Sequence, residues 1–185
     1  GGWPMDDHPP GGMDDRDLPP CIQIQFERPY SVPLRSLFSA DRPNLLMAGR
    51  NISASHVALT STRVMATCAA MGQAAGTAAA FCAAEKCLPR DAAADPARMM
   101  RLQQRLLRDD QSLLGMANAD PEDLARTARV TCSHHAPEGA PEQVTDGWNR
   151  DIGDGNAHQW RAAMDGKEPW LQLEWGKPVT LRRVQ

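Results

Sequence analysis

Hydrophobic and polar positions form two short strand-like patterns in the first fifty residues. The alternation from Cys21 to Phe26, "CIQIQF", predicts a strand with one buried face. The apolar run from Asn44 to Gly49, "NLLMAG", is typical of a buried parallel strand whose end opens into a functional loop. The proline- and glycine-rich stretch 1–20 predicts loop structure before them.

Two helices follow. One is expected from about Ser61 to Leu88, with Thr60, Ser61 or Thr62 capping its start and Pro89 ending it. A second is expected to start at Asp95-Pro96 and to cover "PARMMRLQQRLLRDD". Its apolar residues form one stripe, which predicts a helix with a single buried face. The stripe consists of Met99, Leu102, Leu106 and Leu107.

The composition changes around residues 115–128, where alanines become sparse and tryptophans frequent. Three short segments of the last sixty residues, "ARVTC", "WLQLEW" and "VTLRRV", have strand character and are separated by turn sequences such as "DGKEP". An antiparallel sandwich, incomplete at its C-terminal end, is the simplest interpretation. We therefore predict one domain over 1–115, a linker over 116–126 and a second domain over 127–185.

Length and charge limit the classes of protein. The chain has 185 residues, 42% of them hydrophobic, which is enough to form a packed core. Its net charge of -3 and the absence of a run of Lys or Arg that could neutralise phosphates argue against nucleic acid as a partner. Five cysteines without CxxC spacing do not predict a complete disulfide framework. The start at Gly1 and the strand-like last residues lead us to expect a fragment of a longer protein.

The small-residue helix over 61–88 has three interpretations. Its uncharged length is compatible with a membrane span, but polar residues and the low transfer energy of Ala and Gly argue against one. It is also compatible with an ordinary core helix in which small residues permit close packing. The third interpretation adds a cofactor at the helix N-terminus, where free N–H groups and the helix dipole attract negative or electron-rich groups.

The segment "NLLMAGRNISASHVALTSTRVMATCAAMGQAAGTAAA", with "GGWPMDDHPP" and "YSVPLRSLF" before it and "LQQRLLRDDQSLLG" after it, resembles a family of FAD-dependent oxidoreductases. That family is distantly related to the fumarate reductase and succinate dehydrogenase flavoproteins. The resemblance covers about residues 1–115 and implies the C-terminal strand and helices of an FAD-binding, Rossmann-like α/β domain. No GxGxxG occurs in the chain, so the remainder of the parent chain is expected to supply the Gly-rich dinucleotide-binding unit.

The resemblance implies two groups of FAD-binding residues. One group ends the strand where the ribityl and pyrophosphate of FAD pass, and the other opens the helix, with amides directed at the pyrimidine edge of the flavin. The strand-end group is Ala48, Gly49 and Arg50, and the helix-start group is Arg63, Val64 and Met65. Small residues further inside the helix are assigned to close helix packing instead. These are Gly72, Ala75, Gly76 and Ala79.

Four further residues are candidates near the substrate. The sequence places His56 in the loop between the strand and the helix, and His56 is the candidate catalytic residue, as a proton donor or acceptor for hydride transfer. A hydrogen bond to the flavin edge and a structural role are its alternatives. His8 is a weaker substrate candidate, with loop stabilisation as its alternative. Tyr30 and Arg35 are candidates for the border of the substrate cavity.

The tryptophan-rich tail resembles the start of a galactose-binding-like jelly roll of the discoidin type, an incomplete all-β sandwich over 127–185. Trp148 and Trp160 are candidates for stacking on a carbohydrate, although Trp in a small sandwich is often core. Asp146 and Asp154 have the oxygen ligands that Ca²⁺ prefers, but they also suit ordinary turns. No metal site is predicted, because adjacent residues of a strand, such as those at 134 and 135, point to opposite faces.

Together these patterns predict part of an FAD-dependent oxidoreductase that transfers a hydride to or from a small-molecule substrate, which the tail suggests is a glycan or a related compound. The isolated fragment is expected to be inactive, since half of its cofactor site is missing. The alternative is a carbohydrate-binding or adhesion protein in which the flavin-like segment is a scaffold. A sugar-binding tail favours the periplasm or the exterior, whereas the scattered thiols favour the opposite, so localisation is left open.

Overall fold

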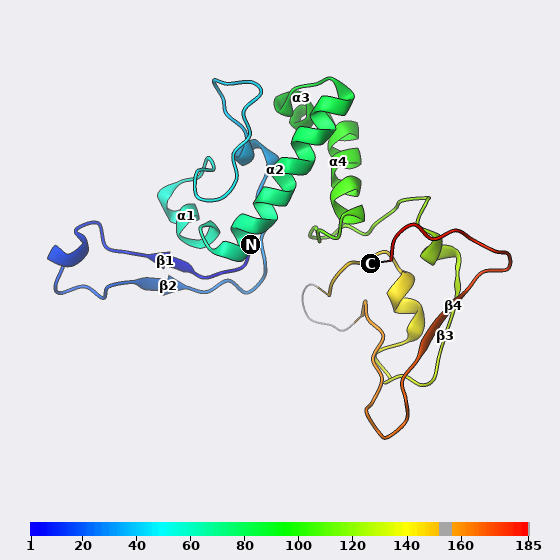
Figure 1. Ribbon diagram of the computed structural model, residues 1–185. Helices are drawn as coiled ribbons and strands as arrows, with labels where there is room; N and C mark the ends of the chain where they lie inside the picture. Colours follow the sequence, from blue (N-terminus) through cyan, green and yellow to red (C-terminus); the bar gives the residue numbers. More distant parts are fainter. Residues whose placement is uncertain (152–156, 185) are drawn as a thin grey trace. The chain divides into compact units, whose positions relative to one another are not determined.

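The computed structural model describes residues 1–151 and 157–184, and the chain divides into two compact units, Gly1–Gln103 and Gln104–Gln185 (Figure 1). The division falls within the last helix of the first unit, earlier than the predicted boundary at residue 115. The helices and strands are β1 (Met5–Asp7), β2 (Ile22–Ile24), α1 (His56–Thr62), α2 (Met65–Glu85), α3 (Pro89–Ala94), α4 (Pro96–Arg108), β3 (Arg129–Cys132) and β4 (Leu171–Glu174).

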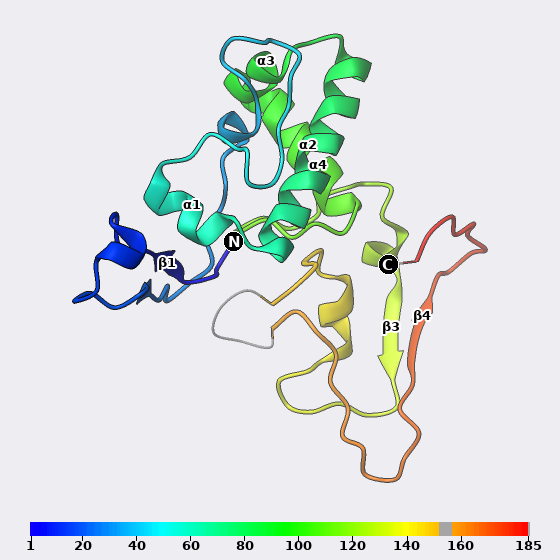
Figure 2. The same cartoon turned by 60° about the vertical axis from the view of Figure 1, so that its left-hand side comes forward.

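Strands β1 and β2 form an antiparallel hairpin, residues 5–24, which we call the arm. Met5 pairs with Ile24, and Asp7 pairs with Ile22. The arm projects from the helices of the first unit (Figure 2). The predicted strand is therefore present, but its predicted buried face is wrong: Ile22 and Ile24 are 52% and 48% exposed, because no second layer covers the arm among the described residues.

The apolar segment 44–49 does not form the predicted parallel strand. It makes only an isolated antiparallel bridge between Phe38 and Leu46, next to a hydrogen bond from the Met47 amide to the Leu37 carbonyl (2.8 Å). A parallel strand needs neighbouring strands in the same sheet, and the described part of the chain provides none for this segment. The segment instead packs on the small core formed by Leu37, Ile52 and Met71.

The expected single helix over 61–88 is two helices, α1 and α2, that meet at an angle of 97°. Helix α1 begins earlier than predicted because the Ser55 hydroxyl caps it, accepting a hydrogen bond from the Ala58 amide (3.2 Å). Thr60, predicted as a cap, lies inside α1 and donates to the Val57 carbonyl. Helix α2 ends at Glu85, before Pro89, which begins α3.

Helix α2 buries one narrow face of mostly small side chains and leaves the opposite face open. The buried residues are Thr67, Met71, Ala75, Ala78 and Cys82. A Cβ added at Gly72 or Gly76 would meet no atom within 4 Å outside the helix's own backbone. The sequence predicted close helix packing at four small residues. Within the described part of the chain, that prediction is correct for Ala75, which is buried, and wrong for the two glycines and for Ala79, which are exposed.

Helix α4 has the predicted extent and stripe. Leu102, Leu106 and Leu107 are at most 6% exposed, whereas Met100 is 50% exposed. Asp95 caps the helix through hydrogen bonds from the Arg98 and Ala97 amides, and these bonds hold the pKa of its carboxyl below the ordinary value.

The second unit contains a two-stranded antiparallel sheet, in which Arg129 pairs with Glu174 and Cys132 with Leu171. The strands predicted in "ARVTC" and "WLQLEW" are confirmed. The segment "VTLRRV" forms no strand over its described residues. Over its described residues, the rest of the unit consists of the end of α4, turns and irregular segments, and two 3-10 helices, Leu124–Thr127 and Pro141–Thr145. The jelly-roll sandwich stays a prediction.

Among the described residues, no single helix is long and apolar enough to cross a membrane. The pair α1 and α2 meets that test jointly by length and composition, across its 97° bend.

Candidate functional site

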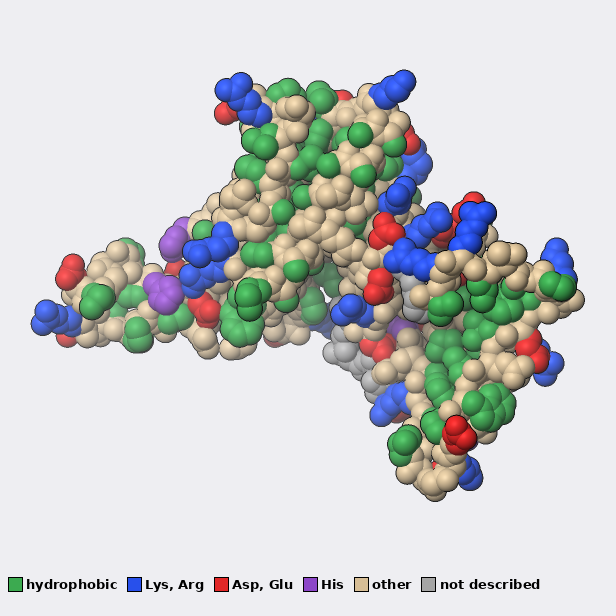
Figure 3. Space-filling model, viewed as in Figure 1, with side chains coloured by type: hydrophobic (Ala, Val, Ile, Leu, Met, Phe, Trp, Pro, Cys, Tyr) green, Lys and Arg blue, Asp and Glu red, His purple; other side chains and the backbone are tan. Residues whose placement is uncertain are grey.

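The base of the arm meets helix α1, and there polar groups from distant parts of the sequence come together. Arg63, the residue that ends α1, directs its guanidinium toward the arm. Its Nη2 atom lies 3.4 Å from the Asp6 carbonyl oxygen and 3.3 Å from Nε2 of His8. In Figure 3, histidine and basic side chains lie next to each other in this region. We call this place the arm junction.

The two hydrogen bonds of His8 distinguish its two ring nitrogens as donor and acceptor. Its Nδ1 lies 2.7 Å from the carbonyl oxygen of Pro20, which can only accept, so Nδ1 carries the proton. Its Nε2 faces the guanidinium of Arg63, which can only donate, so Nε2 is an acceptor. These contacts assign the neutral Nδ1–H tautomer to His8.

The positive charge of Arg63 is held by neutral groups. The side chain is half-buried, and no carboxylate lies within ion-pair distance of it in the described ranges. The nearby Asp6 carboxylate is already engaged, because it accepts from Trp3 Nε1 and Gln23 Nε2, both at 2.9 Å. A partly desolvated cation without a counter-charge favours an anionic or electron-rich ligand.

His56 lies on the same junction but not in the loop where the sequence placed it. It is the first residue of α1, because Ser55 caps the helix one residue before it. Its Nε2 lies 3.5 Å from Oδ1 of Asp7, and its side chain is 77% exposed. The structure therefore brings His56, His8 and Arg63 to one place, and pairs His56 with a carboxylate.

Tyr30 and Arg35, predicted at the border of a substrate cavity, have different surroundings. The Tyr30 hydroxyl lies 2.5 Å from the Ser61 hydroxyl, which donates to the Trp3 carbonyl (2.5 Å). Since Ser61 uses its proton on that carbonyl, Tyr30 donates to Ser61, which is 2% exposed. This relay ties three segments together. Arg35 is exposed in the 3-10 helix Leu34–Leu37 and is not part of the arm junction's contacts.

The predicted residues at 48–50 form a turn next to the start of α2. Ala48 packs on the core, and Gly49 has a φ of +87°, which favours glycine. A Cβ at Gly49 would lie 3.9 Å from the Cys68 sulfur on α2. Arg50 is exposed, with no hydrogen bond or ion pair from its side chain in the described part of the chain.

The start of α2 leaves its first amide groups without a side-chain cap. Val64 is the capping residue and offers no side-chain hydrogen bond, and Met65, the first helical residue, is 89% exposed. The first amides of a helix have no partner within the helix, so they are open to a ligand. The family resemblance implied a helix that opens at Arg63, Val64 and Met65, and α2 starts at Met65, whereas the sequence pattern had started the helix at about Ser61.

Sequence reasoning did not single out Asp6, Asp7 or Ser61 as site residues. Asp6 and Asp7 were visible as neighbours of His8 in "MDDHPP", but their link to α1 was not. Ser61 was considered only as a cap. No sequence pattern marks these residues, because each of them contacts a segment that is far away in the sequence.

In the second unit, Trp148 stacks on His158, with ring centroids 4.8 Å apart. The Nδ1 of His158 lies 2.6 Å from Oδ2 of Asp146. Trp160 is half-buried and donates its indole N–H to the His134 carbonyl (3.1 Å). His158 was not singled out in the sequence. The Ca²⁺ interpretation also needs Asp154, which lies outside the described residues; within them no group of three or more metal-ligating side chains occurs.

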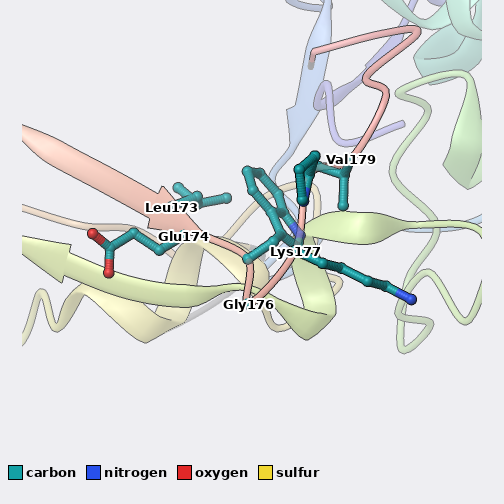
Figure 4. Close-up of a pocket in the computed structure, with 7 residues that line it drawn as sticks. Leu173, Glu174, Gly176, Lys177 and Val179 are labelled. Carbon is teal, nitrogen blue, oxygen red and sulfur yellow. The ribbon is translucent and has the colours of Figure 1, made fainter.

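An open pocket of about 550 Å³ lies at the end of β4, lined by the consecutive residues 173–179 (Figure 4). Its charged residues, Glu174 and Lys177, point in opposite directions, and its Trp175 donates to the Leu124 carbonyl (2.8 Å). No nucleophile or pair of interacting titratable groups lines it, so this pocket has no chemistry comparable with that of the arm junction.

Comparisons with known proteins identify a family for the part of the chain that contains the arm junction. The sequence model of one family, described as FAD dependent oxidoreductase, matches residues 1–106, which are more than half of the 185 residues and include the whole first unit. Searches of curated proteins and of solved structures gave no match.

Proposed function

Because the chain belongs to the FAD-dependent oxidoreductase family, whose cofactor is FAD, we propose that its first unit forms part of an FAD site for two-electron transfer. In this proposal a hydride passes between a small-molecule substrate and the cofactor. The observation that carries it is the half-buried guanidinium of Arg63, held by neutral acceptors beside an uncapped helix start within the matched residues.

The residues of the first unit fit such a cofactor. FAD combines a negative pyrophosphate with a ring that becomes electron-rich on reduction, and uncapped helix amides and an unbalanced cation suit both. Val64 and Met65 would contribute the amides, and Arg63 the charge. Gly49, with its positive φ, would allow close approach of the chain next to Ala48 and Arg50.

When bound, FAD supplies the two-electron chemistry itself, and the protein supplies orientation and charge. In the proposed site, Arg63 stabilises negative charge on the ligand because it has no carboxylate partner of its own. His56 holds or delivers a proton at Nε2, next to Asp7 Oδ1 (3.5 Å). His8, Tyr30 and Arg35 are kept as proposed substrate-side residues.

Partners and substrate are proposals of the same kind. The remainder of the parent chain would supply the Gly-rich dinucleotide-binding unit, and the distant relationship to fumarate reductase flavoproteins is proposed from the motifs at 44–79. A glycan-related substrate is proposed because the second unit carries Trp148 and Trp160 in a galactose-binding-like sequence context. The half-burial of both tryptophans also suits a packing role. The alternative of a pure carbohydrate-binding protein has less support, because the family match covers the first unit.

The visible absorption spectrum of the purified full-length protein tests the proposal. We expect flavin bands, and we expect Arg63→Ala to weaken FAD retention because the charge at the helix start is lost. Arg42→Ala is the matched control, since Arg42 is an exposed arginine outside the junction. A well-folded protein that is colourless, even after incubation with FAD, would reject the FAD site.

A further inference from the structure

The guanidinium of Arg63 depends on the arm for its position. A free arginine side chain loses rotamer entropy when it is fixed, so a defined orientation requires defined acceptors. At the junction these are the Asp6 carbonyl oxygen at 3.4 Å and His8 Nε2 at 3.3 Å. Both belong to the arm, 57 and 55 residues away in sequence.

His8 is the acceptor that is itself anchored. Its Nδ1–H donates to the Pro20 carbonyl across a distance of 2.7 Å, on the opposite side of the imidazole from Arg63. A ring fixed at one nitrogen presents the lone pair of the other in one direction. His8 therefore connects Pro20, which lies just before β2 in the arm, with Arg63 at the end of α1.

We propose that His8 is a positioning residue: as the Nδ1–H tautomer it holds the Arg63 guanidinium at the α1–α2 bend and thereby sets the reduction potential of the flavin. This inference rests on the proposed function. Without the acceptor at His8, the guanidinium retains only the long contact to Asp6 and turns toward solvent. A cation further from the ring stabilises reduced, negatively charged flavin less.

The test uses the full-length FAD-loaded protein and its midpoint potential, measured by equilibration with a redox dye. We expect His8→Leu to disfavour reduced flavin about tenfold, which for a two-electron couple is about 30 mV more negative. His8→Gln retains an acceptor toward Arg63 and is expected to retain the wild-type potential. Gln25→Leu, at an exposed position directly after the arm and outside the junction, is the matched control.

A double-mutant cycle shows whether His8 acts through Arg63. If it does, His8→Leu adds nothing to the change in potential caused by Arg63→Ala. An unchanged potential in His8→Leu, or additive effects of the two changes, overturns the inference while the FAD site stands.

Nitrogen NMR of the His8 ring provides a readout that does not depend on the cofactor. The Nδ1–H tautomer is expected in the wild type, and an Nε2–H tautomer overturns the positioning contact. A wild-type protein that binds no FAD overturns the proposed function, and with it the effect on the flavin, so the two failures are distinguishable.

Discussion

Helices α2 and α4 are separated in sequence only by the short helix α3 but have opposite compositions. Helix α4 buries large leucines on one face, and Asp95 caps its start. Helix α2 buries mainly small residues, has no side-chain cap and exposes alanines and glycines on its other face. In α4 the buried leucine side chains stabilise the fold. In α2 the small side chains leave the helix backbone accessible to a packing partner or a ligand. The helix that serves the proposed site is therefore the one with less packing of its own.

The largest effect is expected for removal of a leucine from α4. Leu102 is 2% exposed, so Leu102→Ala should lower the free energy of unfolding by about 2–5 kcal/mol through lost burial and a cavity. Met100→Ala, at a 50% exposed position of the same helix, is the control and should change it by less than about 0.5 kcal/mol. Urea unfolding measures both. Equal losses would show that α4 has no single buried face.

Enlarging a buried small residue of α2 should cost less. Ala78 is fully buried, so Ala78→Leu is expected to lower the free energy of unfolding by about 1–3 kcal/mol because it overpacks the face. Ala79→Leu, the adjacent exposed position, should be nearly neutral. The comparison uses the same unfolding assay, and a well-tolerated Leu at 78 would contradict the close packing of this face.

A substitution on the open face of α2 is expected to raise the free energy of unfolding instead of lowering it. Nothing outside the helix lies within 4 Å of a Cβ at Gly76, so Gly76→Ala should stabilise the chain by about 1 kcal/mol through helix propensity. Thermal unfolding of the 185-residue chain measures it. If the same change destabilises the full-length protein, another part of that protein packs on this face. If Gly76→Ala destabilises the isolated 185-residue chain, this face of α2 is packed within the chain itself, which contradicts the structure.

The smallest effect at neutral pH concerns the buried thiol near the end of α2. Burial, reinforced by the neighbouring Cys87, raises the pKa of Cys82 from its ordinary value of 9.0 to about 11. A raised pKa means that the folded state disfavours the thiolate, so this contribution to stability is present below pH 9 and is lost as the pH rises toward 11. We expect Cys82→Ala to reduce the loss of stability between these pH values.

Thiol labelling provides the control for that prediction. At neutral pH a thiolate-directed reagent should modify Cys82 more slowly than half-buried Cys21 in the same chain. Rapid labelling of Cys82 in the folded protein would contradict its protonated, buried state.

Sequence patterns predicted α4, the strands β3 and β4, and the helical nature of 61–85, because periodicity and caps are local properties. They failed at 44–49, where an apolar run suggested a parallel strand and the neighbours that such a strand needs are not in the described chain. They also failed to predict the early start of α1, because Ser55 was not recognised as its cap, and the bend at 63–64, where the extended backbone of Val64 interrupts the helix.

The sequence by itself determined the family, the face of α4 and the segments that contain the candidate residues. Only the tertiary structure decided that His8 contacts Arg63 and that Asp7 pairs with His56. These contacts join residues 55 and 49 positions apart and depend on how the arm packs on α1. A local pattern indicates which residues share a helix or strand. The contacts of the Arg63 guanidinium with the Asp6 carbonyl and His8, by contrast, form only when the chain has folded.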